Sequence, residues 1–521
     1  MNGVVHMSMH DLQELSMLRC NLSGPLDPSL ARLENLSVIV LDNNNLSSPV
    51  AETFSHFKNL KILRLYECEL TGTFPQKIFN IRTLSYLDIS WNNNLHGFLP
   101  EFPSSGSLYS LSVSHTNFSG PIPFSIGNMR NLSELDLSIC GFNGIIPNSL
   151  SNLTKLSYLD LSLNSFTGPM TLFSVPKKLS HLGLSNNDLS GLIPSSHFEV
   201  LDLSINSISG TIPSCLMMMM NGTLEALNLK NNNLSGPIPN TVPVSCEVLD
   251  LGSNQITGGF PCFLKEISTL GVLILRNNKF QGSLKCLKAN KTWEMLQIVD
   301  IAFNNFSGKL PRKYFTTWKR NITGNKEEAG SKFIEKQISS GNGLYYRDSI
   351  TVSNKCQQME LVKILTIFTS IDFSSNHFDG PIPQDLMDWK ELYVLNLSNN
   401  AFSGKIPPSI GNMRKLESLD LSQNSLSGEI PAQLANNDGL YGPPLTKNPD
   451  HKEQEVLPQQ KCGSESEVGY NLSMSITPTS AEASPTLRIG RNEMLSYAVP
   501  LVFGTLLDLL QRIAQSAPTS F

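Results

Sequence analysis

The amino-acid sequence predicts an α/β repeat solenoid, a curved and twisted superhelix with one parallel strand per repeat. Two observations predict this fold. The phrase L-x-x-L-x-L-x-x-N-x-L-x-G-x-I-P recurs sixteen times, most often at intervals of 24 residues. In each copy, as in LDLSINSISGTIP at 201–213, apolar residues alternate as in a strand until the alternation stops at the asparagine. A fixed period of this length is the signature of stacked structural repeats.

The first element of each repeat is the L-x-L core at positions four to six of the phrase. Alternation directs its leucines inward and their polar neighbours outward. One short strand alone has no partner, but stacked copies can pair in parallel at a spacing of about 4.8 Å. We therefore expect a continuous parallel sheet on one face of the solenoid.

The second element is the turn at the ninth position, which is Asn in twelve copies. Backbone groups buried in a turn need hydrogen-bond partners, and an Asn side chain has both a donor and an acceptor. Thr and Cys can donate one bond, and they fill the ninth position at Cys20, Cys68, Thr116 and Cys140. The Gly that follows permits a tight bend, and the Pro ends strand extension.

The third element returns the chain to the next strand. Segments such as FSIGNMRNL at 124–132 predict a short 3₁₀ or irregular helix. One return segment is shortened, because the ninth positions at Asn187 and Asn206 are only 19 residues apart. We expect a local kink or poor packing there.

These patterns divide the chain into six parts. They are a short N-terminal segment without a signal peptide (1–11), thirteen repeats (12–311), an island segment (312–367), three repeats (368–431), a degenerate cap with a disordered stalk (432–487) and a remnant membrane-span segment (488–521). The apolar stretch at 494–510 is shorter than the roughly 20 residues of a spanning helix, and it contains Pro500 and Asp508.

Charge and composition limit the function classes. The formal net charge is −5 and the pI is about 6.0, so nothing predicts nucleic-acid binding. Thirteen Asn-x-Ser/Thr sequons predict a glycosylated, secreted surface, although an Asn- and Ser-rich repeat also creates sequons by chance. The sequons are Asn21, Asn35, Asn45, Asn117, Asn131, Asn152, Asn221, Asn233, Asn290, Asn305, Asn321, Asn396 and Asn471.

The chain has nine cysteines, so at least one has no disulfide partner within it. Cys262 and Cys286 occupy the same position of adjacent repeats. Stacked neighbours lie about 5 Å apart, within the roughly 4.4–6.8 Å between Cα atoms that a disulfide requires. We predict a disulfide between these two residues, with two buried thiols as the alternative.

We expect neither an enzyme nor a cofactor or metal site, because the sequence contains no motif for catalysis, metal binding or phosphate binding. One strand position repeatedly carries aspartate. We interpret it as repeat consensus on a solvated face rather than as a set of catalytic carboxylates. These residues are Asp88, Asp136, Asp160, Asp202, Asp250, Asp300, Asp372 and Asp420.

Binding through exposed strand positions is the remaining function, since solenoids bind through such surfaces. Aromatic residues and arginine are frequent anchors of recognition, and they gather in the repeats between residues 60 and 163. The alternative is that these aromatic side chains pack on one another. The candidate ligand-binding residues are Arg64, Tyr66, Tyr86, Trp91, Tyr109, His115 and Tyr158.

The G-x-I-P form of the repeat resembles the plant-type leucine-rich repeats of extracellular receptors. LYYRDSITVSNKCQQMELVKILTIFTSIDFSSNHFDGPIP at 344–383 resembles the island and following repeats of plant receptor-like proteins of the Verticillium-resistance-like and Cf-like group. NDGLYGPPLTKN at 437–448 resembles the capping segment of that group, with Tyr441 where the cap usually carries a cysteine. No signal peptide or cysteine cap precedes the first repeat, so we interpret the chain as a truncated member.

The resemblance implies the ligand-recognising ectodomain of a kinase-less receptor-like protein in plant defence signalling. Such a protein is a single-pass, type I cell-membrane protein with extracellular repeats. Its implied partners are a peptide or microbial protein ligand and recruited receptor kinase co-receptors. Two alternatives stay open: a secreted leucine-rich-repeat inhibitor of microbial cell-wall hydrolases, and a non-functional truncated relic.

The island segment is the candidate site of co-receptor recruitment. Its 56 residues are too many for a simple connection, and loops held on rigid scaffolds commonly carry binding functions. We expect a mobile loop beside the last three repeats, with Tyr345, Tyr346 and Arg347 as co-receptor contacts. The alternative is that these side chains only pack the island onto the solenoid.

Overall fold

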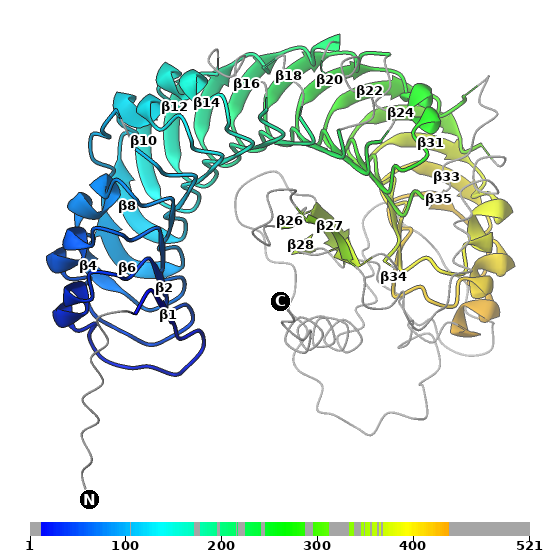
Figure 1. Ribbon diagram of the computed structural model, residues 1–521. Coiled ribbons are helices and arrows are strands. Elements are labelled where there is room, and N and C mark those ends of the chain that lie inside the picture. The colour runs from blue at the N-terminus through cyan, green and yellow to red at the C-terminus, as the bar shows by residue number, and fades with distance from the viewer. Residues whose placement is uncertain are drawn as a thin grey trace, which may run out of the picture. The chain divides into compact units, whose positions relative to one another are not determined.

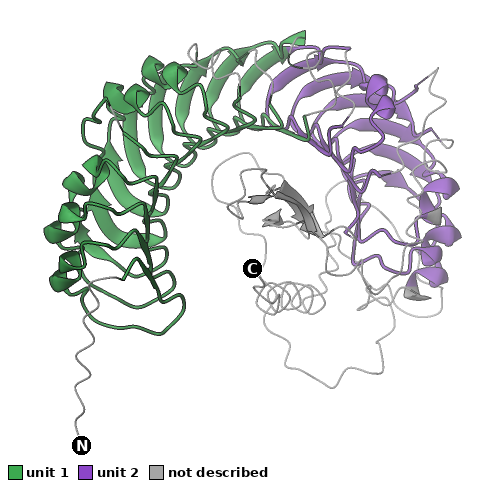
Figure 2. Cartoon of the chain, in the orientation of Figure 1, with its two compact units in different colours: residues 1–235, 339–343 green, residues 236–338, 344–521 purple. Residues whose placement is uncertain are grey.

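The computed structural model describes residues 12–436, apart from residue 105, 171–177, 195–197, 215, 217–223, 241–244, 287–294 and most of 312–367. The chain forms two compact units (Figure 2). The first comprises residues 1–235 and 339–343, and the second comprises 236–338 and 344–521.

In the first unit, one short strand from each of ten repeats pairs in parallel with the strand of the next repeat (Figure 1). The middle residue of each described strand from Val38 onward is buried, because alternation turns it inward. The predicted strands are confirmed. They are β1 (Glu14–Ser16), β2 (Val38–Val40), β3 (Ile62–Arg64), β5 (Tyr86–Asp88), β7 (Ser110–Ser112), β9 (Glu134–Asp136), β11 (Tyr158–Asp160), β13 (His181–Gly183), β15 (Val200–Asp202) and β17 (Ala226–Asn228).

The second unit repeats this arrangement with six described strands. They are β19 (Val248–Asp250), β21 (Val272–Ile274), β23 (Ile298–Asp300), β30 (Ser370–Asp372), β32 (Val394–Asn396) and β34 (Ser418–Asp420). Strands β23 and β30 are neighbours although 56 residues of island separate their repeats, with Ile298 opposite Ser370. The island is therefore an insertion that leaves the parallel pairing of this unit unbroken.

A second parallel strand follows the turn in most repeats, and the sequence analysis did not predict it. It begins at or just after the ninth position and ends near the glycine of the phrase, whose φ is positive. These strands are β4 (Thr71–Thr73), β6 (Asn92–Gly97), β8 (Thr116–Gly120), β10 (Gly141–Ile145), β12 (Ser165–Pro169), β14 (Asp188–Gly191), β16 (Ser207–Gly210), β18 (Asn233–Gly236), β20 (Gln255–Gly258), β22 (Lys279–Gly282), β24 (Asn305–Lys309), β31 (His377–Gly380), β33 (Ala401–Gly404) and β35 (Ser425–Leu426).

The described return segments are mostly single 3₁₀ turns, as the segment at 124–132 predicts. In most of them the proline of the phrase lies at the cap and fixes φ for entry into the turn. They are η2 (Pro28–Arg32), η3 (Glu52–His56), η4 (Gln76–Asn80), η5 (Phe124–Asn128), η6 (Asn148–Asn152), η7 (Cys262–Glu266), η8 (Gln384–Asp388), η9 (Pro408–Asn412) and η10 (Ala432–Asn436).

The asparagine at the ninth position joins each turn to the preceding one. The Asn92 amide nitrogen donates to the carbonyl oxygens of Leu65, in the preceding repeat, and Ile89, both at 2.9 Å. Its amide oxygen accepts hydrogen bonds from the backbone N–H groups of Cys68 and Leu70. One fully buried side chain therefore satisfies backbone groups of two repeats.

Thr and Cys at the ninth position each replace part of this pattern, as predicted. The Thr116 hydroxyl donates to the Val113 carbonyl at 2.6 Å. The Cys68 thiol donates to the Leu41 carbonyl at 3.0 Å, and burial raises its pKa to about 11. These side chains stay neutral and serve as hydrogen-bond donors within the ladder.

Stacked phenylalanines fill the core beneath the second strands. In the second unit Phe280, Phe306, Phe378 and Phe402 stand at the same position of successive repeats, and all are buried. Their ring centroids lie 5.9, 6.3 and 6.2 Å apart in that order. Such aromatic stacking adds to the burial of apolar area and fixes the spacing of the turns.

The shortened repeat at 187–206 does not interrupt the pairing, so the expectation of poor packing is wrong for its described residues. Strand β13 pairs with β15 in register, with Leu182 opposite Leu201. The Asn206 amide still donates to the Leu184 carbonyl and accepts from the Leu189 N–H group. The missing residues therefore come from the return segment, and the strand and the ladder are complete.

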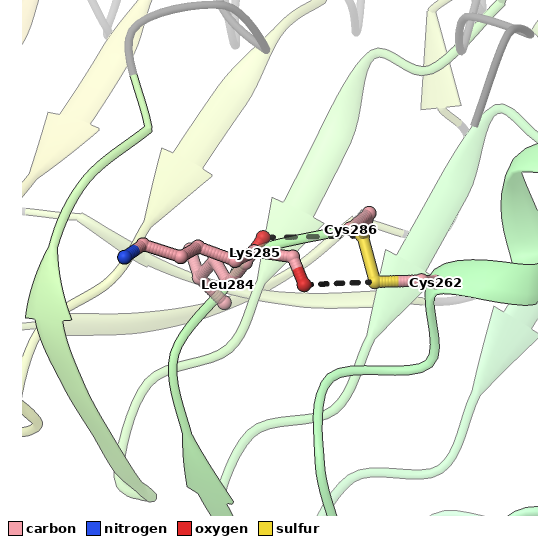
Figure 3. Close-up of a disulfide and its surroundings, with 4 residues drawn as sticks. All are labelled: Cys262, Leu284, Lys285 and Cys286. Carbon is pink, nitrogen blue, oxygen red and sulfur yellow. Dashed lines mark hydrogen bonds between the residues drawn. A yellow bond between two sulfur atoms is a disulfide. The ribbon is translucent and has the colours of Figure 1, made fainter. Parts of the chain in front are cut away.

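A disulfide joins Cys262 and Cys286, whose Cα atoms lie 5.5 Å apart (Figure 3). The sulfur atoms lie beside the carbonyl oxygens of Lys285 and Leu284. Cys262 opens η7 and Cys286 follows β22 in the next repeat, so the bond links two adjacent turns of the second unit. This is the pairing that the equal repeat positions predict.

Candidate ligand-binding face

The candidate site is the outward side of the first strands in the first unit, which we call the strand face. It consists of positions two, three, five, seven and eight of the phrase. At position five an aspartate commonly accepts hydrogen bonds from the serine two residues later. The Asp136 carboxylate accepts from the Ser138 N–H at 3.0 Å and from the Ser138 hydroxyl at 2.7 Å. This pairing fixes the start of the turn.

The position-five aspartates are not on a freely solvated face, and that interpretation is wrong. Asp88, Asp250, Asp300 and Asp372 are buried, and the other four are half-buried, since neighbouring strands cover their sides. Burial, followed by the charge of Asp160, raises the pKa of Asp136 to about 7. Burial likewise raises the pKa of Asp160 and Asp202. The carboxyl groups of Asp136, Asp160 and Asp202 therefore titrate above their ordinary range, and their hydrogen bonds to serine give them a structural role.

Five of the seven predicted binding residues lie in two groups that Asp42 links, since its carboxylate also accepts a hydrogen bond from the Tyr66 N–H. The Arg64 guanidinium forms an ion pair with Asp42 at 2.6 Å and lies 5.9 Å from the centroid of the Tyr86 ring. The rings of Tyr66 and Trp91 lie 6.4 Å apart. Burial raises the pKa of Tyr86 to about 12, so this phenol remains protonated at physiological pH.

Trp91 and His115 form the most exposed part of this cluster. Their rings stack with centroids 3.8 Å apart and an angle of 14° between the planes. Trp91 is 46 % exposed, whereas His115 is half-buried, and burial lowers its pKa. The imidazole is therefore mainly neutral near pH 7, and the pair presents a flat aromatic surface.

Tyr109 and Tyr158 have different environments. Tyr109 is exposed at position two of its repeat. Tyr158 is only 6 % exposed, because its ring stacks on His181 in the next repeat with centroids 4.9 Å apart. Tyr158 is thus a packed residue and not an exposed anchor, as the alternative interpretation of strand aromatics anticipated.

Two groups of residues on the outward positions were not predicted from the sequence. In the first unit, Ile139, Leu163 and Ile205 are exposed apolar side chains at position eight. In the second unit, Arg276 forms an ion pair with Asp300 at 2.9 Å and lies 5.4 Å from the Phe303 ring centroid. Comparing residue types at equal repeat positions would have identified both groups.

The described sequons of the first unit lie away from the strand face. Four of them directly follow the ninth position, and the others lie in return segments; all are exposed. In the second unit Asn396 is at position five, where its amide oxygen accepts from the Ser398 N–H and hydroxyl. The exposed first-unit sequons are Asn21, Asn35, Asn45, Asn117, Asn131, Asn152 and Asn233. Asn221, Asn290, Asn321 and Asn471 lie outside the described residues.

The predicted co-receptor contacts fall on a short island strand, β26 (Tyr345–Arg347), which pairs antiparallel with β25 (Phe333–Gln337). The other island strands are β27 (Ile350–Asn354), β28 (Gln357–Leu361) and β29 (Ile364–Leu365). Within the described part of the chain, no helix has the length and hydropathy to cross a bilayer. The stretch at 494–510 lies outside that part.

Family models described as leucine-rich repeats match this chain at 34–95, 107–129, 131–153, 178–198, 197–219, 223–243, 391–413 and 415–437. Receptor-like protein 35 of Arabidopsis thaliana is 38 % identical over 255 residues, which cover 43 % of this chain and 26 % of that protein. Receptor-like protein 53 of the same plant is 36 % identical over 253 residues, covering 43 % and 25 %. The match thus spans about a quarter of the length of these relatives.

Solved structures with this fold include plant receptors. The plant peptide hormone receptor RGFR1 in complex with RGF2 is 28 % identical, with a TM-score of 0.66 over 82 % of this chain and 61 % of that one. The Arabidopsis receptor kinase HAESA, in complex with the peptide hormone IDA and the co-receptor SERK1, is 26 % identical, with a TM-score of 0.57 over 79 % and 70 %.

Proposed function

We propose that the repeats of this chain form a ligand-recognising ectodomain at the cell surface, since leucine-rich-repeat models match parts of the chain and its sequence is similar to plant receptor-like proteins. The ligand is a peptide or a microbial protein, and the response is a defence signal that passes through recruited receptor kinases. The strand face of the first unit is the binding surface.

The observation that carries this proposal is the aromatic cluster on that face. Arg64 lies against the Tyr86 ring, and the Trp91 ring neighbours those of Tyr66 and His115. Asp42 links the two groups, because its carboxylate pairs with Arg64 and accepts a hydrogen bond from the Tyr66 N–H. Trp, Tyr and Arg are the side chains that most often dominate binding energy. The described sequons of the first unit leave this face uncovered, because they directly follow the ninth position or lie in return segments.

The similar solved structures support a peptide ligand and a kinase partner. One of them is a peptide hormone receptor in complex with RGF2, and the other is in complex with the peptide hormone IDA and the co-receptor SERK1. Sequence similarity to receptor-like proteins supports the cell surface as the location. For this chain we propose that the ligand binds the strand face and that the co-receptor binds at the island.

The test uses the full chain, secreted from insect cells behind a heterologous leader, and a randomised twelve-residue peptide display library. Enriched peptides should bind the wild type and lose at least about tenfold in affinity on Trp91→Ala, since hot-spot truncations commonly cost more than 2 kcal/mol. The matched control is Phe303→Ala, at the same repeat position of the second unit and 39 % exposed; it should bind normally.

A second arm addresses recruitment. The SERK1 ectodomain should associate with the peptide-loaded wild type, and the double variant Tyr346→Ala/Arg347→Ala should bind peptide but not SERK1. Equal peptide binding by wild type and Trp91→Ala would contradict the binding face. Failure to enrich any peptide, together with inhibition of a fungal polygalacturonase, would favour the inhibitor alternative.

A further inference from the structure

The residue at position eight of every repeat is in the left-handed backbone region. Its φ lies between 51° and 58° in all sixteen copies. Asn tolerates this region well, and it occurs there at Asn43, Asn186, Asn231, Asn277 and Asn399. A β-branched side chain in this region is an outlier, since its second γ atom crowds the backbone.

Part of the first unit departs from that preference. Position eight is Trp91, His115, Ile139, Leu163 and Ile205 in five of the six repeats between residues 85 and 206, with Asn186 in the sixth. We call these five side chains the apolar row. All except His115 are exposed. The row therefore raises the free energy of the folded protein in two ways: its backbone is strained, and its apolar surface is exposed to water.

Packing accounts for only part of the row, because Ile139, Leu163 and Ile205 are 38, 46 and 41 % exposed. Strained residues persist where a function requires them, and contiguous exposed apolar side chains mark interaction sites. The same position is polar in the turns on either side, with Glu67 before the row and Asn231 after it. Within the first unit the departure is thus confined to one stretch, whereas in the described repeats of the second unit Phe303 is the single apolar residue at position eight.

The formally charged side chains beside the row are all acidic. Between residues 85 and 206 the strand-face positions, all described, contain no Lys or Arg. They contain six acidic residues: Asp88, Glu134, Asp136, Asp160, Glu199 and Asp202. An approaching cation would favour the charged form of these carboxyl groups, since an opposite charge nearby lowers their pKa.

We propose that the apolar row binds an extended peptide segment that carries both apolar and basic side chains and lies across the strands. The row is one side chain wide and repeats at about 4.8 Å per turn, which suits an extended chain better than a broad protein surface. Apolar ligand side chains cover the row, and basic ones lie over the carboxylates. This inference rests on the proposed function and specifies the chemistry of its ligand.

The experiment uses the same peptide library on the full chain, and it reads the composition of the enriched peptides. We expect net positive charge together with apolar residues. For the most enriched peptide, Ile139→Asn and Ile205→Asn should each raise Kd at least about tenfold, a loss of roughly 1.4 kcal/mol or more. Phe303→Asn, at position eight of the second unit, should leave Kd unchanged.

Thermal unfolding gives a readout that needs no ligand. Ile139→Asn and Ile205→Asn should raise Tm, because Asn relieves the strain at a position where the same chain uses it five times. Asn186→Ile, which would complete the row, should lower Tm and keep or tighten binding.

Each outcome bears on a different claim. Enriched peptides that are acidic, or that bind both Asn variants as they bind the wild type, would overturn this inference and leave the proposed function standing. A lower Tm for both Asn variants would identify the row as core packing and overturn the inference. Failure of the library to yield any binder would overturn this inference and leave only a microbial protein as the ligand of the proposed function.

Discussion

At the scale of single residues, the half-buried aspartates make the stability of the protein depend on pH. Burial and the neighbouring Asp160 raise the pKa of Asp136 to about 7. The folded state therefore holds this proton more tightly than the unfolded state, whose carboxyl groups titrate near 3.8. A group of this kind stabilises the fold most at low pH, and the contribution is lost as pH rises toward 7.

We predict that Asp136→Asn weakens this dependence. The variant keeps the hydrogen bonds to Ser138, since Asn396 makes the equivalent pair with Ser398. The wild type should lose on the order of 1–3 kcal/mol of unfolding free energy between pH 5 and pH 8, at about 1.4 kcal/mol per unit of pKa difference. The variant should lose less. Denaturation at both pH values checks this, and equal losses would contradict it.

Residue identity at the strand face was only partly predictable. Residue types and repeat positions were sufficient to select Arg64, Tyr66, Tyr86, Trp91 and His115, which the structure brings together. They were not sufficient for Tyr158, because its burial depends on which residue the next turn places beside it, and that residue is His181. Contacts between neighbouring turns decide exposure, and a single repeat does not contain that information.

At the scale of elements, the asparagine ladder joins successive repeats through buried side-chain hydrogen bonds. We predict that Asn92→Ala lowers the free energy of unfolding by on the order of 3 kcal/mol. The reason is that it leaves buried backbone N–H and carbonyl groups of two repeats without partners.

The matched control is Asn92→Thr. Thr occupies the ninth position naturally at Thr116, where its hydroxyl donates to one carbonyl and accepts from the Phe118 N–H. We therefore expect a smaller loss than for Ala, measured by chemical denaturation. If the two variants lost equal stability, the side-chain hydrogen bonds of the ladder would contribute little to the free energy of unfolding.

The first strand and the turn followed directly from the repeat phrase, and the second strand did not. Residues such as those of β16, Ser207 to Gly210, carry one buried apolar side chain among small polar ones. That composition suits a turn as well as a strand. It becomes a strand because the ladder holds successive turns in register, with Ser209 opposite Asn233, and this arises only on stacking.

At the scale of the whole molecule, each repeat contacts mainly its neighbours, so the effect of a local change should stay local. The disulfide between Cys262 and Cys286 gives a test within the second unit. A bridge that closes a loop of this length contributes about 3 kcal/mol by restricting the unfolded chain.

We predict that reduction of this disulfide, or the variant Cys262→Ser/Cys286→Ser, lowers the Tm of the second unit. Faster hydrogen exchange should appear in β19, β21 and β23 and leave β3 to β13 of the first unit unchanged. Exchange that increased equally in both units would show that they unfold as a single cooperative block.

The direct pairing of β23 with β30 also makes the connection between these strands a suitable site for inserting a foreign sequence. The chain leaves the stack after Pro311 and rejoins it by Phe368, and Phe306 still donates its N–H to Asn376 across a separation of 70 residues. The entropic cost of a longer loop grows only logarithmically with its length. The repeats already tolerate an insertion at this place. A fluorescent reporter or a second recognition module inserted between these two points should therefore leave the pairing of β23 with β30 intact.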